Sequence, residues 1–151
     1  VDDPDKLRVI LTSLSSLTRS MPVVFPLHPR TRQRVSEFGL GSLLESLTAT
    51  EPLGYTEMLG LQAGAAVVVT DSGGVQEETT VLGIPCLTLR HNTERPITIE
   101  MGTNILVGTD PEKIRAAAFE ILATEDHASE PNVPPLWDGK TAGRICDELL
   151  K

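Results

Sequence analysis

Five consecutive apolar residues, Ala65–Val69, leave few options for the fold of this chain. Their number and their β-branching are typical of a strand that is buried on both faces of a parallel sheet. The polar segment Thr70–Glu78 follows at once, and Val75–Leu82 reads as a helix that stops at Gly83. A buried strand that turns directly into a helix predicts an α/β unit, with the turn at an edge of the sheet.

The turn of this unit contains Ser72, Gly73 and Gly74. Backbone N–H groups in the first turn of a helix have no acceptor within the helix, so they can bind an anion. The two glycines let a ligand come close to the backbone, and Ser72 adds a hydroxyl donor. This geometry favours a phosphate or a diphosphate. An N-capped helix after a tight turn explains the same spacing without a ligand, and the spacing alone leaves both interpretations open.

Strands and helices alternate through the rest of the chain. Further strands are predicted in Val23–Leu27, Leu47–Leu53, Pro85–Arg90 and Thr103–Val107. Helices are predicted from Pro4 through Leu17, through Val35 and Phe38, and in Gly54–Gly64, Ile97–Met101, Ile114–Leu122 and Gly139–Leu150. Residues 28–32, 91–96 and 124–135 read as loops. The alternation predicts an α/β fold with a Rossmann-like parallel sheet and helices on both faces.

Composition narrows the class of partner. The chain has 151 residues, with 13 basic and 21 acidic side chains and a net charge of −8, which argues against a nucleic acid or a membrane surface. We find no apolar run of transmembrane length and no metal-ligand spacing. Cys86 and Cys146 stand in apolar surroundings, and we expect both to be buried thiols in a cytoplasmic protein.

In an open parallel sheet, ligands bind beyond the carboxyl ends of the strands. Four polar segments are predicted there: His28–Arg32, Glu51–Leu53, Asp71–Glu78 and Arg90–Arg95. Arginines at positions 30, 32, 90 and 95 can bind phosphates, although they can equally pair with carboxylates of this acidic chain. His28 can donate to a phosphate or transfer a proton, or be a plain loop residue. Glu77 and Glu78 are predicted in the first helical turn, where a carboxylate can accept from both hydroxyls of a sugar, although the helix dipole alone explains carboxylates there.

Eight short motifs carry a resemblance to one family. They are Phe25–Arg30, Glu51–Leu53, Thr70–Glu78, Leu82–Pro85, Thr93–Pro96, Gly102–Asn104, Val107–Asp110 and Trp137–Lys140. In this order, and over nearly the whole chain, they resemble the UDP-N-acetylglucosamine 2-epimerase family. The resemblance implies a two-domain GT-B fold, of which residues 1–151 form the C-terminal, nucleotide-binding domain. The partner N-terminal domain is then absent from this sequence.

The resemblance also implies roles for individual residues. Ser72, Gly73 and Gly74 would hold the diphosphate of UDP, and Glu78 would bind the ribose. His28 would lie near the phosphates as the candidate catalytic residue, and Arg95 would lie in the nucleotide site. Pro52 and Leu53 would face uracil, mainly through backbone groups. No metal and no cofactor is implied.

The family interconverts UDP-GlcNAc and UDP-ManNAc by elimination and re-addition of UDP. Its acid and base carboxylates come largely from the N-terminal domain, so we expect this chain alone to bind UDP weakly and to be inactive. A homodimer is a further expectation. Two other readings stay open, a donor-binding domain of a GT-B glycosyltransferase and a non-catalytic nucleotide-binding module. Met58 departs from the family pattern, which often has an aromatic residue near the uracil.

Overall fold

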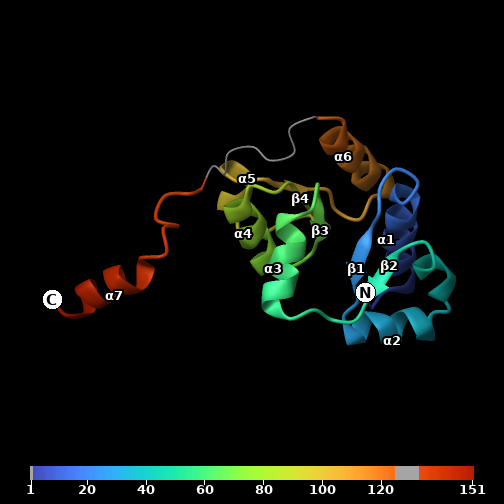
Figure 1. The fold of residues 1–151 in the computed structure, drawn as a ribbon, viewed down its shortest axis with the longest axis horizontal. Coiled ribbons are helices and arrows are strands. Elements are labelled where there is room, and N and C mark those ends of the chain that lie inside the picture. The colour runs from blue at the N-terminus through green and yellow to red at the C-terminus, as the bar shows by residue number, and fades with distance from the viewer. Residues whose placement is uncertain (1, 125–132) are drawn as a thin grey trace.

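The computed structural model describes residues 2–124 and 133–151 of the chain. In chain order the elements are α1 (Pro4–Leu17), β1 (Val24–Pro26), α2 (Pro29–Glu37), the 3-10 turn η1 (Gly41–Leu44), β2 (Thr48–Thr50), α3 (Tyr55–Ala63), β3 (Val68–Thr70), α4 (Gly73–Leu82), β4 (Cys86–Thr88), α5 (Ile97–Glu100), β5 (Asn104–Leu106), α6 (Pro111–Ala123) and α7 (Thr141–Leu149) (Figure 1). The predicted α/β class is therefore confirmed.

All strand pairs are parallel, but the strands form two sheets rather than the single sheet that we predicted. β1 pairs with β2, and β3, β4 and β5 form a second sheet with β4 at its centre. The side chains of Val23 and Val69 pack against both apolar clusters of the core. Side-chain packing thus joins the two sheets where no backbone ladder runs between them.

The central strand β4 shows why helices cover both faces of the second sheet. Leu87 belongs to an apolar cluster with Leu17 of α1 and with Ile114 and Ala118 of α6. Its neighbour Thr88 points to the opposite face and donates a hydrogen bond to Asn104, which in turn bonds to α4. Because successive side chains of a strand point to opposite faces, β4 is buried from both sides.

Helix α1 contributes four leucines to the apolar core. Its leucines at positions 7, 11, 14 and 17 recur at helical spacing, and all four are buried. The first three pack with Val35 of α2, whereas Leu17 packs with α6. Figure 1 shows α1 beside α6 on one side of the molecule, with α3 and α4 on the other.

The predicted polar loop at residues 28–32 was wrong, because α2 begins there. Pro29 occupies the first helical position, where its missing N–H costs nothing and its fixed φ suits a helix. His28 takes the cap position in place of the usual Ser, Thr, Asp or Asn. α4 likewise begins two residues earlier than predicted, at Gly73 rather than Val75.

Two other expectations concern the cysteines and the loop after α6. Cys86 is buried as expected, but Cys146 is exposed on α7, so the prediction of two buried thiols was half wrong. Residues 125–132 of the loop predicted at 124–135 lie outside the described residues. Figure 1 shows α7 projecting away from the sheets and the other helices. Among the described residues, no helix is long and apolar enough to cross a membrane.

Candidate functional site

Each of the four polar segments predicted from the sequence follows the carboxyl end of a strand. Residues 28–32 follow β1, 51–53 follow β2, 71–78 follow β3 and 90–95 follow β4. Ion pairs join these segments two by two. Arg32 lies 2.7 Å from Glu51, and Arg95 lies 2.7 Å from Glu77. The structure therefore brings the segments together within each sheet, as the topology of parallel strands requires.

The N-terminus of α4 is open, unlike the N-termini of α1 and α6. Asp3 accepts hydrogen bonds from two amides at the start of α1, and Asp110 does the same for α6. Ser72 occupies the equivalent position before α4, but its side chain makes no capping bond. Within the described residues, the N–H groups of Gly73, Gly74 and Val75 have no acceptor. The helix-cap interpretation of Ser72 thus lacks its defining contact, and three donors in the first turn are left for a ligand or solvent.

The fold itself does not require glycine at positions 73 and 74. A Cβ atom at Gly73 would lie 3.9 Å from Arg95 Cγ and from Glu94 Oε2, and one at Gly74 would lie 3.9 Å from Ser72 Oγ. These are ordinary van der Waals distances, and neither residue has a positive φ. Packing and backbone conformation both permit alanine, so the fold gives no reason for glycine at either position.

Arg95 lies beside the open N-terminus of α4 because hydrogen bonds connect its loop to that helix. The Arg95 N–H donates to Thr93 Oγ1 at 3.0 Å, and the Thr93 hydroxyl donates to Gln76 Oε1 at 2.6 Å. The half-exposed guanidinium meets Glu77 as a close contact of opposite charges rather than an aligned hydrogen bond. A positive group is thereby held next to three free amides, which is the arrangement that an anion needs.

Gln76 is the centre of a buried polar network that the sequence analysis missed. Its Oε1 accepts from Thr93 and also from Asn104 Nδ2 at 3.1 Å, and Asn104 donates to Thr98 Oγ1. Gln76 is fully buried on α4. The network therefore sets the position of the loop that carries Arg95 relative to the helix that carries the glycines.

His28 is exposed at the start of α2, where its Nδ1 accepts a hydrogen bond from the Arg30 N–H at 3.2 Å. A neutral imidazole with Nδ1 as acceptor carries its proton on Nε2. The His28 side chain thus presents an N–H donor at the carboxyl end of β1. Its predicted place near the phosphates stays a prediction, since the contact described here is with α2.

The segment after β2 is shaped by short-range contacts. Pro52 is exposed and Leu53 is partly buried, and they lead into α3. The Gly54 N–H donates to Glu57 Oε2 at 2.8 Å, which fixes the start of that helix. The uracil contact predicted for Pro52 and Leu53 also stays a prediction.

All four candidate arginines have a carboxylate partner. Arg30 pairs with Asp2, Arg32 with Glu51, Arg90 with Glu94, and Arg95 with Glu77. In this structure, therefore, the four arginines pair with carboxylates of the chain, which is the alternative to phosphate binding that the acidic composition suggested. Arg95 differs from the other three because it also lies against Gly73.

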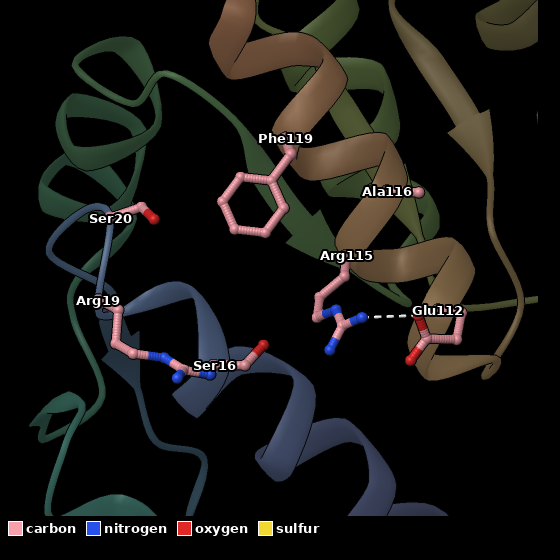
Figure 2. Close-up of a pocket in the computed structure, with 7 residues that line it drawn as sticks. All are labelled: Ser16, Arg19, Ser20, Glu112, Arg115, Ala116 and Phe119. Carbon is pink, nitrogen blue, oxygen red and sulfur yellow. Dashed lines mark hydrogen bonds and ion pairs between the residues drawn. The ribbon is translucent and has the colours of Figure 1, made fainter.

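A pocket of ≈ 290 Å³ lies elsewhere, between the end of α1 and α6. Figure 2 shows the Phe119 ring of α6 projecting over it, with Arg19 on the opposite side and Arg115 paired with Glu112. None of the predicted site residues lines this pocket. No group of three metal-ligating side chains is found in residues 2–124 and 133–151.

Comparison with known proteins identifies relatives over the full length of the chain. A profile of the family described as UDP-N-acetylglucosamine 2-epimerase matches residues 1–150. A UDP-N-acetylglucosamine 2-epimerase of Methanococcus maripaludis is 42% identical over 135 residues, which cover 86% of this chain and 37% of that protein. A UDP-2,3-diacetamido-2,3-dideoxy-D-glucuronate 2-epimerase of Pseudomonas aeruginosa is 40% identical over 151 residues, covering 99% of this chain and 41% of that protein.

Solved structures of UDP-GlcNAc 2-epimerases also resemble the fold of this chain. The crystal structure of a Methanocaldococcus jannaschii UDP-GlcNAc 2-epimerase in complex with UDP-GlcNAc and UDP matches with a TM-score of 0.86 and 38% identity. The match covers 99% of this chain and 42% of that one. The chain thus spans about two fifths of the length of these relatives, and it corresponds to their C-terminal half.

Proposed function

The chain belongs to the UDP-N-acetylglucosamine 2-epimerase family, and we propose that it is the UDP-binding half of such an enzyme. The observation that carries this proposal is the open N-terminus of α4, where three N–H groups without an acceptor in the described part of the chain follow Ser72 beside Arg95. Dipole, donors and a nearby cation together form a site for a diphosphate.

Each part of UDP then has a proposed partner. Ser72, Gly73 and Gly74 bind the diphosphate through backbone N–H groups and the serine hydroxyl. Glu78, one helical turn beyond Gly74, accepts from the ribose hydroxyls. The remaining contacts come from the neighbouring segments: Arg95 and the Nε2–H of His28 for the phosphates, and the backbone of Pro52 and Leu53 for uracil.

The proposed reaction of the complete enzyme interconverts UDP-GlcNAc and UDP-ManNAc. UDP leaves by elimination, and the resulting glycal recaptures it with the opposite configuration at C2. Negative charge grows on the diphosphate as the bond to the sugar breaks. Donors that are already oriented at α4 stabilise that charge without reorganising, so the contribution of this chain is to hold the leaving group.

The same proposal assigns the proton transfers at the sugar largely to an N-terminal domain that this chain does not contain. The chain covers about two fifths of the length of its relatives, which supports a cleft whose second wall is outside it. We therefore expect UDP to bind weakly and epimerisation by this chain alone to be undetectable. A homodimer of the complete enzyme is part of the proposal.

The sugar is the least constrained part of this proposal. The Pseudomonas aeruginosa relative is named for a UDP-linked diacetamido uronate, and it is nearly as similar as the Methanococcus protein. Both names contain UDP and 2-epimerisation. The residues proposed here contact only UDP, so they serve either substrate.

Calorimetry with UDP tests the proposal. We expect a dissociation constant on the order of 0.1–1 mM for UDP. Uridine, which lacks the diphosphate, should give no measurable heat. An absence of heat with UDP at millimolar concentration would contradict the binding proposal, and turnover of UDP-GlcNAc by this chain alone would contradict the incomplete active site.

A further inference from the structure

Gln62 is a buried polar residue that nothing in the sequence singled out. It lies near the end of α3, and only 2% of its surface is exposed. Its Nε2 donates a hydrogen bond to Glu78 Oε2 of α4 at 2.7 Å. The pair thus connects the interior between α3 and α4, which lie side by side in Figure 1, to the carboxylate proposed for the ribose.

The chemistry of the pair fixes the orientation of the amide. An ionised carboxylate only accepts hydrogen bonds, so Gln62 must turn its NH₂ group toward Glu78. Its Oε1 then points the other way, where it has no partner among the described residues. A buried carbonyl without a partner lowers stability, whereas an apolar side chain of the same length would fill the space without that loss. Packing therefore does not explain the amide, and the bond to Glu78 does.

The bond also restricts what Glu78 can do. Glu78 is partly exposed, and in the described residues only its Oε2 accepts a side-chain hydrogen bond. A hydrogen bond to Oε2 restricts the rotamers of Glu78, while among the described residues Oε1 and a second lone pair of Oε2 have no side-chain donor. Two adjacent oxygen acceptors match the two neighbouring hydroxyls of a ribose, and a 2′-deoxyribose offers only one.

We propose that Gln62 is a positioning residue, which orients the Glu78 carboxylate and so gives the site its preference for ribonucleotides over 2′-deoxyribonucleotides. This inference rests on the proposed UDP site. The inference goes beyond the proposed site by naming the residue that sets the sugar preference. Gln62 itself contacts no ligand and acts only through Glu78.

The test compares UDP with 2′-deoxy-UDP by calorimetry on the chain and on its Gln62→Met variant. Methionine matches glutamine in length but cannot donate. For the unchanged protein we expect UDP to bind roughly tenfold tighter than 2′-deoxy-UDP. In Gln62→Met, UDP should weaken by roughly five- to tenfold while 2′-deoxy-UDP changes by less than about twofold, so the preference disappears.

Gln33 provides a matched control. Its Nε2 donates to Glu37 Oε1 at the same 2.7 Å, but on the exposed surface of α2. Gln33→Met should leave both affinities unchanged. An equal loss for both ligands in Gln62→Met would show that Gln62 only supports the fold, and would overturn the inference.

The unchanged protein separates this inference from the proposed function. If it binds UDP and 2′-deoxy-UDP equally, the inference fails and the UDP site stands. If it binds neither, the proposed function fails, and the inference with it.

A second measurement does not depend on the folding of a variant. The chain has three glutamines, at positions 33, 62 and 76, so their side-chain amides give few NMR signals. UDP should shift the Gln62 NH₂ signal, and 2′-deoxy-UDP should shift it by less than half as much. Equal shifts by the two nucleotides would count against a role in reading the ribose.

Discussion

At the scale of single residues, glycines in this chain have three different physical roles. Gly73 tolerates a Cβ within the fold but lies at the proposed ligand site. Gly102 does not tolerate one, because a Cβ there would lie 2.5 Å from Thr80 Oγ1 and 2.6 Å from the Thr98 carbonyl oxygen. Gly60, exposed on α3, would meet nothing within 4 Å. A sequence motif does not distinguish these three glycines. Only the atoms that surround each of them in the structure do.

The first prediction is that Gly73→Ala separates stability from binding. Alanine fits the backbone and restricts the unfolded chain, so the free energy of unfolding should stay equal or rise by up to about 1 kcal/mol. UDP affinity should fall roughly tenfold or more, because the added methyl group occupies the space that the diphosphate needs. Urea unfolding and calorimetry measure the two effects. Unchanged UDP affinity would remove the reason given for this glycine.

Gly102→Ala should have the opposite effect on stability. The new methyl group would overlap Thr80 and a backbone carbonyl of α5, and we expect a loss of about 2–4 kcal/mol. Gly60→Ala is the matched control. It should raise stability by up to about 1 kcal/mol, because alanine is the better helix former. Equal unfolding midpoints for the two variants would mean that α5 moves away from α4 at little cost.

The two cysteines also differ in their surroundings. Burial raises the pKa of the Cys86 thiol, opposed in part by hydrogen bonds with Thr79 and Thr88. Because the pKa is raised in the folded state, this thiol favours folding below its ordinary pKa, and the contribution is lost as the pH rises above it. Cys146 is exposed.

At pH 8 we therefore expect one fast and one slow reaction with a chromogenic aromatic disulfide. The fast reaction should disappear in Cys146→Ser, and the slow one should follow the rate at which the protein opens. Two fast equivalents would show that β4 is accessible in the folded protein.

At the scale of elements, the starts of the helices differ in what satisfies their amides. Asp3 and Asp110 cap α1 and α6, and each bond is internal to the protein. Ser72 leaves the start of α4 open. Aspartate and serine are both common caps, so the sequence could not distinguish a closed helix start from one that awaits a ligand.

The corresponding prediction concerns the same substitution at two helix starts. Asp110→Ala should lower the free energy of unfolding by about 1 kcal/mol and leave UDP affinity unchanged. Ser72→Ala should change stability by less than about 0.5 kcal/mol, because no capping bond is lost, and should weaken UDP by roughly three- to tenfold. Chemical unfolding and calorimetry test both variants. A stability loss in Ser72→Ala equal to that of Asp110→Ala would restore the cap interpretation.

Local patterns predicted the elements better than the contacts between them. The apolar run before Thr70 and the leucine stripe of α1 are properties of neighbouring residues, and the structure confirms both elements. The start of α2 was missed because histidine is an uncommon cap. The pair of Gln62 and Glu78 joins residues 16 positions apart on separate helices, and no spacing rule indicates such a pair.

At the scale of the whole molecule, two parallel sheets share one core, and α7 contributes to neither apolar cluster. The division into two sheets was not predictable, because each strand has the same apolar character whether or not a ladder runs to its neighbour. The position of α7 was equally unpredictable. Its pattern is that of an amphipathic helix, but its apolar side chains Ile145 and Leu149 are exposed, as is Leu150 directly after it.

The last prediction follows from this separation of α7. Among the described residues, the hydrogen bonds and ion pairs of residues 133–151 are made within that segment, for example between Arg144 and Asp138 at 3.0 Å. The Asp138 carboxyl has a lowered pKa because of the Lys140 N–H and Arg144, which again are local groups. Removing residues 133–151 should therefore change the free energy of unfolding of the remaining chain by less than about 1 kcal/mol.

Urea unfolding of the shortened and the complete chain measures this difference. Light scattering of the same two proteins gives a second result. Exposed leucines at positions 149 and 150 favour association, so the complete chain should form more oligomers with rising concentration than the shortened one. A stability loss above about 2 kcal/mol would show that α7 packs against the sheets in solution. Because α7 lies far from the start of α4 in Figure 1, UDP affinity should be the same for both proteins.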